Sequence, residues 1–339
     1  MHRSRLCSVP ACVLVLGTSL TYPALAQRVV RVTPSTVQWG HYDADAKPVL
    51  TVKPGEVVVI DTIVGIPDML EQLGAATDEP IREMKLMYAQ VKDRGPGPHF
   101  LTGPVAIEGA LPGDVLEVEI LDVRLRSPYG WMTMGGSGAL LEEFRRERRK
   151  LVPLDERNKL AEFAPGIRLP VRPFFGNLGV APPTGRLGGG QPAYNGGNLD
   201  NKWLVAGSQV YIPVQVPGAL FSVGDGHAVQ GDGELCGTAI ETNLTGVFRF
   251  AVRKDMKLRG PRAETPTHVI IMGLHESLDE AARLASREMI DYLSAERGLS
   301  REDAYMLASA AVDLHVTQVV NRVKGVHAML PKAIFGAGR

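Results

Sequence analysis

The chain has 339 residues, 45% of them hydrophobic, and its 37 basic side chains balance its 37 acidic ones. This length supplies a core for one large domain or for two to three closely packed subdomains. The balanced charge argues against nucleic acid or an anionic membrane surface as a partner.

The first 26 residues are predicted to be a signal peptide. An arginine-bearing start precedes a largely apolar run, and the small residues at 24–26 suit cleavage before Gln27. The apolar run is short for a membrane span and contains a proline, although an uncleaved anchor stays an alternative. We therefore expect an exported protein, periplasmic or secreted, in which residues 27–339 form the catalytic region and are free of the membrane after cleavage.

Three segments share a Pro-Gly turn and an apolar strand that ends in an acid: 52–61, 110–119 and 216–225. Proline fixes φ and glycine takes the unusual conformation, so each segment predicts a turn that leads into a strand. The acids Asp61 and Asp225 are placed near strand ends. Three such units favour packed β layers, sandwich-like or barrel-like, over alternating βαβ units.

Helical patterns occur mainly near the C-terminus. Residues 138–163 interrupt the strand pattern, and their first half predicts a helix with a charged outer face. Capping signals at Ser277 and Ser300 predict two later helices, and the strands 314–320 and 326–330 follow them. The sequence therefore predicts an α+β, β-dominated fold with C-terminal helices.

The most informative stretch is 222–241, a glycine-interleaved hairpin that follows a predicted apolar strand over 210–223. Side chains alternate on an extended chain, so Asp225 and His227 are expected on the same side. A carboxylate and an imidazole that converge at a strand end suit a metal ion or a proton-transfer pair. A glycine-rich turn with solvated acids remains the alternative interpretation.

A second glycine-rich segment, 188–201, is dominated by Gly-Gly and Asn-Gly pairs. A loop of this length inside a compact chain is typical of a segment that presents side chains to a ligand. A flexible surface loop is the competing interpretation.

The sequence offers little support for a covalent nucleophile. No GxSxG nucleophile elbow is present. Only Cys236 would remain after cleavage, and its position between Leu235 and Gly237 favours a small buried apolar group over a reactive thiolate. Both observations favour water activated by a metal ion.

The chain resembles the acetamidase/formamidase family. The similarity lies in residues 101–114, 196–200, 218–234 and 326–335, and Asp-Gly-His-Ala-x-Gln-Gly-Asp-Gly-Glu within the third segment is its most specific part. The resemblance implies a β-rich fold of several layers, hydrolysis of a short linear amide to a carboxylate and ammonia, and a homo-oligomer. The signal peptide and residues 138–163 depart from the family pattern and leave the substrate open.

For the metal ion we predict Asp225 and His227 as ligands, completed by His99 and Asp61. A nitrogen and oxygen ligand set suits zinc, although other divalent ions fit as well. Each position has a structural alternative: a hydrogen-bonded histidine at 227, a surface loop at His99, and a turn cap at Asp61.

For the chemistry we predict Glu108 and Glu241 as general base and acid with Glu234 behind them, and Asn198 as a hydrogen-bond donor to the substrate carbonyl. Glu108 could instead face solvent, Glu241 could pair with Arg249, and Glu234, like Asp232, could be a turn residue. Asp313 with His315 is a reserve pair.

Two other functions remain compatible with the sequence. One is an exported metal-dependent hydrolase of a different C–N substrate, and the other is a non-catalytic exported binding protein.

Overall fold

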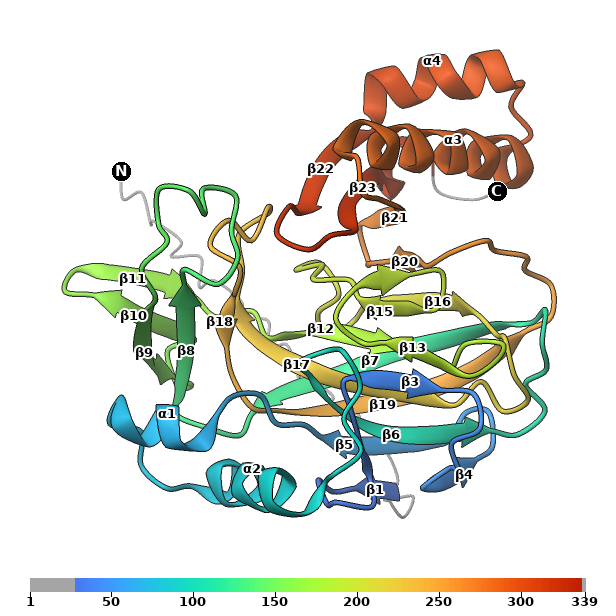
Figure 1. The fold of residues 1–339 in the computed structure, drawn as a ribbon. Coiled ribbons are helices and arrows are strands. Elements are labelled where there is room, and N and C mark those ends of the chain that lie inside the picture. Colours follow the sequence, from blue (N-terminus) through green and yellow to red (C-terminus); the bar gives the residue numbers. More distant parts are fainter. Residues whose placement is uncertain (1–27, 337–339) are drawn as a thin grey trace, which may run out of the picture.

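The computed structural model describes residues 28–336, and these form two large β-sheets that pack on each other (Figure 1). The predicted signal peptide, residues 1–26, lies outside the described residues. The β-dominated fold with packed layers and late helices is confirmed. Of the helices in the described part, none combines the length and apolar character needed to cross a membrane.

The first sheet has nine strands among the described residues. In order across the sheet they are β1 (Arg28–Val30), β5 (Val57–Asp61), β19 (Leu244–Arg253), β7 (Val115–Leu125), β16 (Gln209–Pro213), β20 (Arg262–Glu264), β21 (His268–His275), β23 (Lys324–Pro331) and β22 (Asp313–Gln318).

The second sheet carries the pocket described below. Its main path runs through β11 (Ile167–Pro170), β10 (Leu160–Ala164), β9 (Arg148–Asp155), β8 (Tyr129–Met134), β18 (Ile240–Glu241), β17 (Phe221–Val229), β12 (Phe174–Gly179), β15 (Gly196–Asn198) and β14 (Pro192–Ala193). From β17 the sheet continues into β6 (Phe100–Ile107), which also pairs with β2 (Val37–Trp39) and β4 (Leu50–Val52). A separate ladder joins β3 (His41–Asp43) to β13 (Arg186–Gly188).

The main core fills the space between the two sheets. Phe221 of β17 meets Phe248 and Phe250 of β19 at ring-centroid distances of 5.7 and 5.1 Å, and Phe175 of β12 meets Phe248 at 5.5 Å. All four rings are completely buried. Burial of such side chains is worth about 1.5–3 kcal/mol each, so this contact holds the second sheet firmly beneath the pocket.

The three Pro-Gly units form as predicted, because each turn leads into β5, β7 or β17. The apolar run 210–223, expected as one strand, is instead divided between β16 and β17. Gly218 lies between them with φ of +79°, so the Pro-Gly turn of the third unit separates the two strands.

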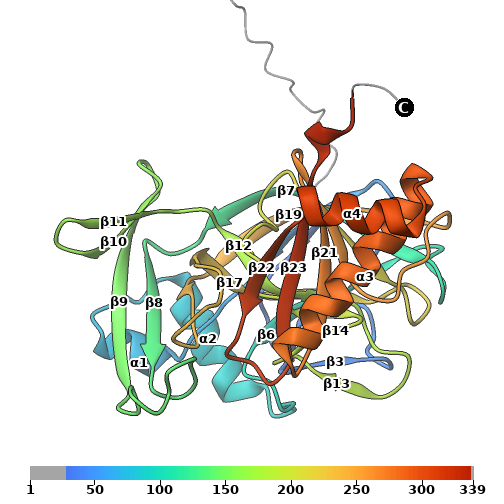
Figure 2. The ribbon, with the colours of Figure 1, turned by 90° about the horizontal axis from the view of Figure 1, so that it is seen from above.

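The helices occupy the margins of the sheets. The predicted pair is present as α3 (Leu278–Arg297) and α4 (Arg301–Ala311), and Ser277 and Ser300 cap them by accepting backbone N–H bonds. Helix α3 packs on β21 and β23 (Figure 2). Two further helices, α1 (Pro67–Gln72) and α2 (Glu79–Gln90), belong to a separate core cluster with residues of β2 and β6, and a short 3₁₀ turn, η1 (Lys332–Ile334), follows β23.

The helix predicted in the first half of 138–163 is wrong. A single turn forms at Leu140, whose carbonyl accepts from Glu143 and Phe144, and β9 begins at Arg148. Within β9, Val152 and Leu154 are buried while Pro153 and Asp155 are exposed, which is the alternation of a strand. The run of charges at 145–150 hides this alternation, and an isolated turn without a packed face does not propagate into a helix.

Candidate active site

A cavity of about 430 Å³ lies where β6, β17 and β18 meet the segments around residues 65, 190 and 237. Its floor is polar and its walls are largely apolar. Its charged lining residues are His99, Asp200, Asp225, His227, Glu234 and Glu241, and the aromatic side chains of Trp39, Tyr88 and Trp131 line it as well. Asp225, His227 and Glu241 lie on the paired strands β17 and β18 of the second sheet, so the sheet holds their side chains in fixed positions.

Asp225 is the centre of the first group of side chains. His227 follows it by two residues on β17, and its Nε2 lies 3.5 Å from Asp225 Oδ2. Strand pairing sets His227 opposite Glu241 of β18, so that Nε2 also lies 3.3 Å from Glu241 Oε2. His99, just before β6, brings its Nε2 to 3.5 Å from Asp225 Oδ1. Asp225, His227 and Glu241 are all buried.

Both imidazoles are oriented by bonds to their Nδ1 atoms. His227 Nδ1 lies 2.9 Å from Gln230 Oε1, and the Gln230 amide in turn donates to the Asp200 carbonyl at 2.6 Å. His99 Nδ1 lies 3.1 Å from Asn177 Nδ2, and the Tyr42 hydroxyl holds Asn177 by donating to its Oδ1 at 2.5 Å. These bonds leave Nε2 of each ring directed at Asp225, which is the arrangement that second-layer hydrogen bonds impose on metal-binding histidines.

Asp200 and Glu234 form a second group with His227. One ligand atom of each of the three residues lies within 4.8 Å of the others. Asn198 and Asn321 donate to Asp200 Oδ2 at 2.6 and 3.2 Å, which fixes that carboxyl group. The pocket therefore gathers four buried carboxyl groups around one ring.

Burial and mutual repulsion separate the proton affinities of these groups. Burial opposes the ionisation of Asp225, but the adjacent His99 and His227 outweigh it and lower its pKa to about 2. Burial raises the pKa of Glu234 to about 8, and it raises those of Glu241 and Asp200 as well. For His227, burial favours the neutral ring, yet the charges of Glu241 and Asp225 prevail and raise its pKa.

The backbone is strained at this site. Asp200, Asp225 and Glu234 have φ of 49°, 57° and 48°, a conformation that non-glycine residues rarely adopt. They make up half of the six non-glycine residues with positive φ in the described chain. Such strain costs of order 1–3 kcal/mol per residue and concentrates at functional sites.

Gly176 of β12 gives the acids room to converge. A Cβ at this position would lie 2.6 Å from Asp200 Oδ1, from Asp225 Oδ2 and from His227 Cε1. Within the described chain, Asp200 Oδ1 and Glu241 Oε2 are buried without a hydrogen-bond partner. Unpartnered carboxylate oxygens beside two oriented imidazoles match the donor set of a divalent cation, and the residues present fit such an ion.

Six of the eight predicted site residues meet in this cavity. His99, Asn198, Asp225, His227, Glu234 and Glu241 all line it. Glu241 does not pair with Arg249, which instead bonds Glu119. Asn198 donates its Nδ2 to Asp200, so its observed contact is with a neighbouring acid. The segment 188–201, which could have been a flexible surface loop, contributes buried Asn198 and Asp200.

Two predicted residues lie outside the cavity. Asp61 is buried, but it accepts from Arg31 at 2.6 Å and from Thr245 at 2.5 Å, so its charge is already matched. Glu108 is exposed at the turn after β6 and has no place among the pocket residues. The assignments of Asp61 as a ligand and of Glu108 as a base are therefore corrected.

Cys236 is half-buried rather than part of the core as predicted. Its Sγ lies 3.6 Å from the Thr238 carbonyl, and it lines a separate apolar hollow with Leu140, Leu141 and Phe144. The residues described as lining this hollow are small, apolar or hydroxyl-bearing and include no histidine or carboxylate.

Sequence reasoning missed Asp200, Gln230, Asn177 and Asn321. Asp200 has a usable signal, because it stands two residues after Asn198 in the Gly-Gly-Asn-Leu-Asp run and therefore near the same ligand. Asn177 and Asn321 carry none, since each reaches the site only through tertiary packing.

The fold and this pocket define a β scaffold that carries a buried cluster of carboxyl and imidazole groups, and comparison with known proteins identifies its family. The model of the acetamidase/formamidase family matches residues 32–187 and 190–337. The chain therefore belongs to the acetamidase/formamidase family. Its resemblance in sequence is thereby confirmed, as is the expectation of an amidohydrolase of linear amides.

Individual relatives agree with this assignment. A formamidase of Methylophilus methylotrophus is 26% identical over 82% of this chain and 84% of its own length. A putative formamidase of Schizosaccharomyces pombe is 31% identical, but the match spans only 56% of that protein and 48% of this chain. The crystal structure of an acetamidase from Bacillus halodurans superposes with a TM-score of 0.77 at 32% identity and covers 91% of this chain and 98% of that one.

Proposed function

We propose that this chain hydrolyses a short linear amide to a carboxylate and ammonia, with the help of a divalent cation held by Asp225, His227 and Glu241, with His99 beside them. The observation that carries the proposal is the convergence of the Nε2 atoms of His99 and His227 on the buried carboxyl group of Asp225. Glu241 Oε2 lies beside the same His227 Nε2 atom. The nitrogen and oxygen donors favour zinc.

Amide resonance makes the carbonyl carbon a poor electrophile, so hydrolysis needs an activated water and stabilisation of the charge that develops on oxygen. A bound divalent ion supplies both, because it lowers the pKa of water and polarises a carbonyl. The four carboxyl groups and two imidazoles are arranged to hold such a charge where water is largely excluded.

Glu234 is suited to move the proton. Its pKa of about 8 lies close to neutrality, where a carboxyl group can both accept and donate. We assign it the proton of the attacking water, which it returns to the departing nitrogen so that ammonia leaves. Glu241 then holds the ion rather than serving as the acid, and Asn198 keeps Asp200 in position.

The pocket walls restrict the substrate. Trp39, Tyr88 and Trp131 line the cavity, and Gly176 of β12 leaves the space beside Asp200, Asp225 and His227 that a Cβ would fill. A neutral, compact substrate suits this mixture of apolar wall and polar floor. The proposed partner is therefore a small amide.

Ammonia release from formamide, acetamide, propionamide and urea by zinc-loaded protein tests the reaction. We expect turnover of at least one amide, its loss in Asp225→Ala, and its retention in Glu108→Gln, whose side chain is exposed. Absence of ammonia from all four with folded, zinc-loaded protein would refute the amidase. Equal rates for Asp225→Ala and the parent protein would refute the site.

We also propose that the protein acts after export, in the periplasm or outside the cell, as a homo-oligomer. The basic start and apolar run of residues 1–26 support export. Cell fractionation, N-terminal sequencing of the mature protein and its mass in solution test these two points. Recovery in the cytoplasm with Met1 intact would contradict the first, and a monomer at micromolar concentration the second.

A further inference from the structure

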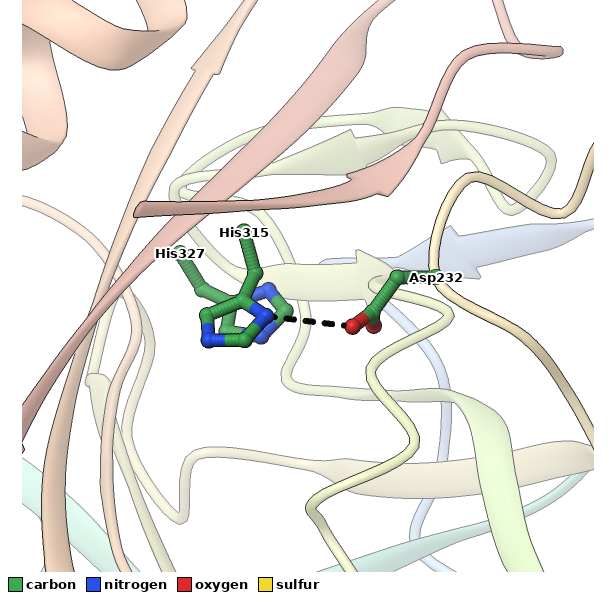
Figure 3. A group of neighbouring side chains, drawn as sticks. All are labelled: Asp232, His315 and His327. Carbon is green, nitrogen blue, oxygen red and sulfur yellow. Dashed lines mark hydrogen bonds and ion pairs between the residues drawn. The ribbon is translucent and has the colours of Figure 1, made fainter. Parts of the chain in front are cut away.

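A second group of metal-binding side chains lies outside the cavity, between the C-terminal strands and the loop after β17. His315 of β22 and His327 of β23 stand opposite each other in the strand pairing, with their rings stacked at 5.1 Å. Asp232 reaches toward both rings from the facing loop (Figure 3). One ligand atom from each of the three residues lies within 4.8 Å of the others.

His327 has a free nitrogen in the protein interior. The ring is completely buried, and its Nδ1 lies 2.7 Å from Thr317 Oγ1. Nε2 has no hydrogen-bond partner within the described chain. An unpartnered buried imidazole nitrogen carries a cost that a ligand would remove.

The distances suit a small divalent ion. Asp232 Oδ2 lies 3.2 Å from His315 Nδ1, close to the edge of about 3.3 Å that bond lengths near 2.0 Å give a tetrahedral zinc site. Lys202 Nζ lies 2.8 Å from the same oxygen. This ammonium group marks a position that attracts positive charge, and its side chain is partly exposed, so it can withdraw to solvent.

We propose that Asp232, His315 and His327 bind a second divalent cation, of the zinc type, in exchange for the Lys202 ammonium group. Three protein ligands leave one position for water. Of the reserve pair, His315 is a ligand of this site, whereas Asp313 is not, because its side chain is exposed and His315 turns to Asp232 instead.

The ion would join two separate parts of the fold. Gly233, next to Asp232, already exchanges backbone hydrogen bonds with residues 317 and 319 at 3.1 Å. Glu234, one residue further, lines the catalytic cavity. The second ion would therefore fasten the loop that positions Glu234 to the C-terminal strands. This consequence, unlike the binding itself, rests on the proposed function.

Titration of metal-free protein with Co²⁺ and Zn²⁺ tests the binding, by elemental analysis, visible Co²⁺ absorption and tryptophan fluorescence. Trp203 is a built-in reporter, because its ring lies 6.4 Å from His315. We expect two equivalents in the parent protein and one in either His315→Gln or Asp232→Asn. The matched control is His268→Gln, since His268 flanks the same Trp203 at 6.2 Å and lies outside the cluster. It should keep both equivalents.

The two sites can be told apart. Asp225→Asn with His227→Gln should lose one equivalent and keep the Trp203 response, while His315→Gln should lose that response and at least tenfold in affinity for its ion. Failure of the catalytic site alone would leave a parent protein with one equivalent, which His315→Gln and Asp232→Asn remove and the Asp225→Asn, His227→Gln variant keeps. The second site is refuted if His315→Gln and Asp232→Asn, both folded by near-UV circular dichroism, bind as much metal as His268→Gln.

Discussion

Asp61 and Asp225 have the same sequence context but different charge partners in the fold. Each is the acid that closes a Pro-Gly strand unit, and each side chain is almost completely buried, with 1% and 3% of the residue exposed. Asp61 meets Arg31 at 2.6 Å, Arg126 at 3.8 Å and a threonine hydroxyl. Asp225 meets two imidazoles at 3.5 Å and, among residues 28–336, forms no ion pair with a guanidinium group.

The difference shows what makes a buried carboxylate available for chemistry. A guanidinium group does not release its proton in a protein, so its ion pair with Asp61 is permanent. An imidazole can lose its proton, so a cation can take a place beside Asp225 that a guanidinium group would not give up. The strained φ of Asp225 and the unpartnered oxygens near it support the same distinction, since a purely structural acid needs neither.

The largest expected effect is the loss of activity when Asp225 loses its charge. Asp225→Asn should lower kcat/KM for the preferred amide more than about 1000-fold, equivalent to about 4 kcal/mol, because a neutral amide cannot hold the ion or balance two imidazoles. Ammonia release and bound zinc should fall together. Asp61→Asn should stay within about threefold of the parent rate per folded molecule. Comparable losses in both variants would remove the distinction.

The next effect concerns stability at Asp61. Asp61→Asn should lower the free energy of unfolding by about 3 kcal/mol, because it leaves nearly buried Arg126 with one carboxylate fewer. Urea unfolding at fixed metal concentration measures this change. Asp122 on β7, whose side chain is 42% exposed beside Arg124, provides the control, and Asp122→Asn should change stability by less than about 0.5 kcal/mol. A similar small change for Asp61→Asn would show that its pairing is dispensable.

Sequence patterns predicted the strand units, because a Pro-Gly turn and apolar alternation are local properties that tertiary packing did not override at β5, β7 and β17. They also placed Asp225, His227 and Glu234 together, since spacing along one hairpin fixes their separation. They could not separate Asp61 from Asp225. The partners that decide the matter, Arg31 for one and His99 for the other, come from distant segments.

The same limit explains the errors elsewhere. The charged run at 145–150 looks helical, yet the buried neighbours of Val152 that select a strand lie on β10, β17 and β18. Glu108 directly follows β6, whereas Asp61 is the last residue of β5, and the turn after β6 exposes Glu108 to solvent. Local pattern therefore predicts elements and hairpin sites, whereas charge partners require the fold.

The third prediction concerns Glu234 in the pocket and the pH dependence of stability that its raised pKa causes. The pKa of this acid rises from about 4.5 unfolded to about 8 folded, so between these values the unfolded chain loses a proton that the folded chain keeps. The stability of metal-free protein should therefore fall as the pH rises from 4.5 to 8. Glu234→Gln removes this penalty. At pH 8.5 it should gain at least about 2 kcal/mol over the parent protein, with no gain at pH 4.

Chemical denaturation of EDTA-treated protein across this pH range measures the effect. Glu264 serves as the control, because it is half-buried beside Lys332 and lies on β20 of the nine-stranded sheet, whereas the pocket belongs to the other large sheet. Glu264→Gln should show no such gain at high pH. A gain for Glu234→Gln that is independent of pH would mean that Glu234 is ionised in the folded state, and its role as the proton carrier would then fail.

The smallest expected effect concerns Tyr42, which contacts His99 only through Asn177. Tyr42→Phe removes the hydroxyl that donates to Asn177 Oδ1, while Asn177 Nδ2 stays 3.1 Å from His99 Nδ1. We expect a loss of about 1 kcal/mol in stability, the usual contribution of one hydrogen bond, and a reduction of about tenfold in zinc affinity because His99 is held less firmly. Calorimetric zinc titration and thermal unfolding measure the two. The control is Tyr211→Phe, because Tyr211 is a buried tyrosine on β16 of the nine-stranded sheet. This variant should leave zinc affinity unchanged. If Tyr42→Phe also leaves it unchanged, His99 does not contribute to the hold on the ion, and Asp225 depends on His227 and Glu241 alone.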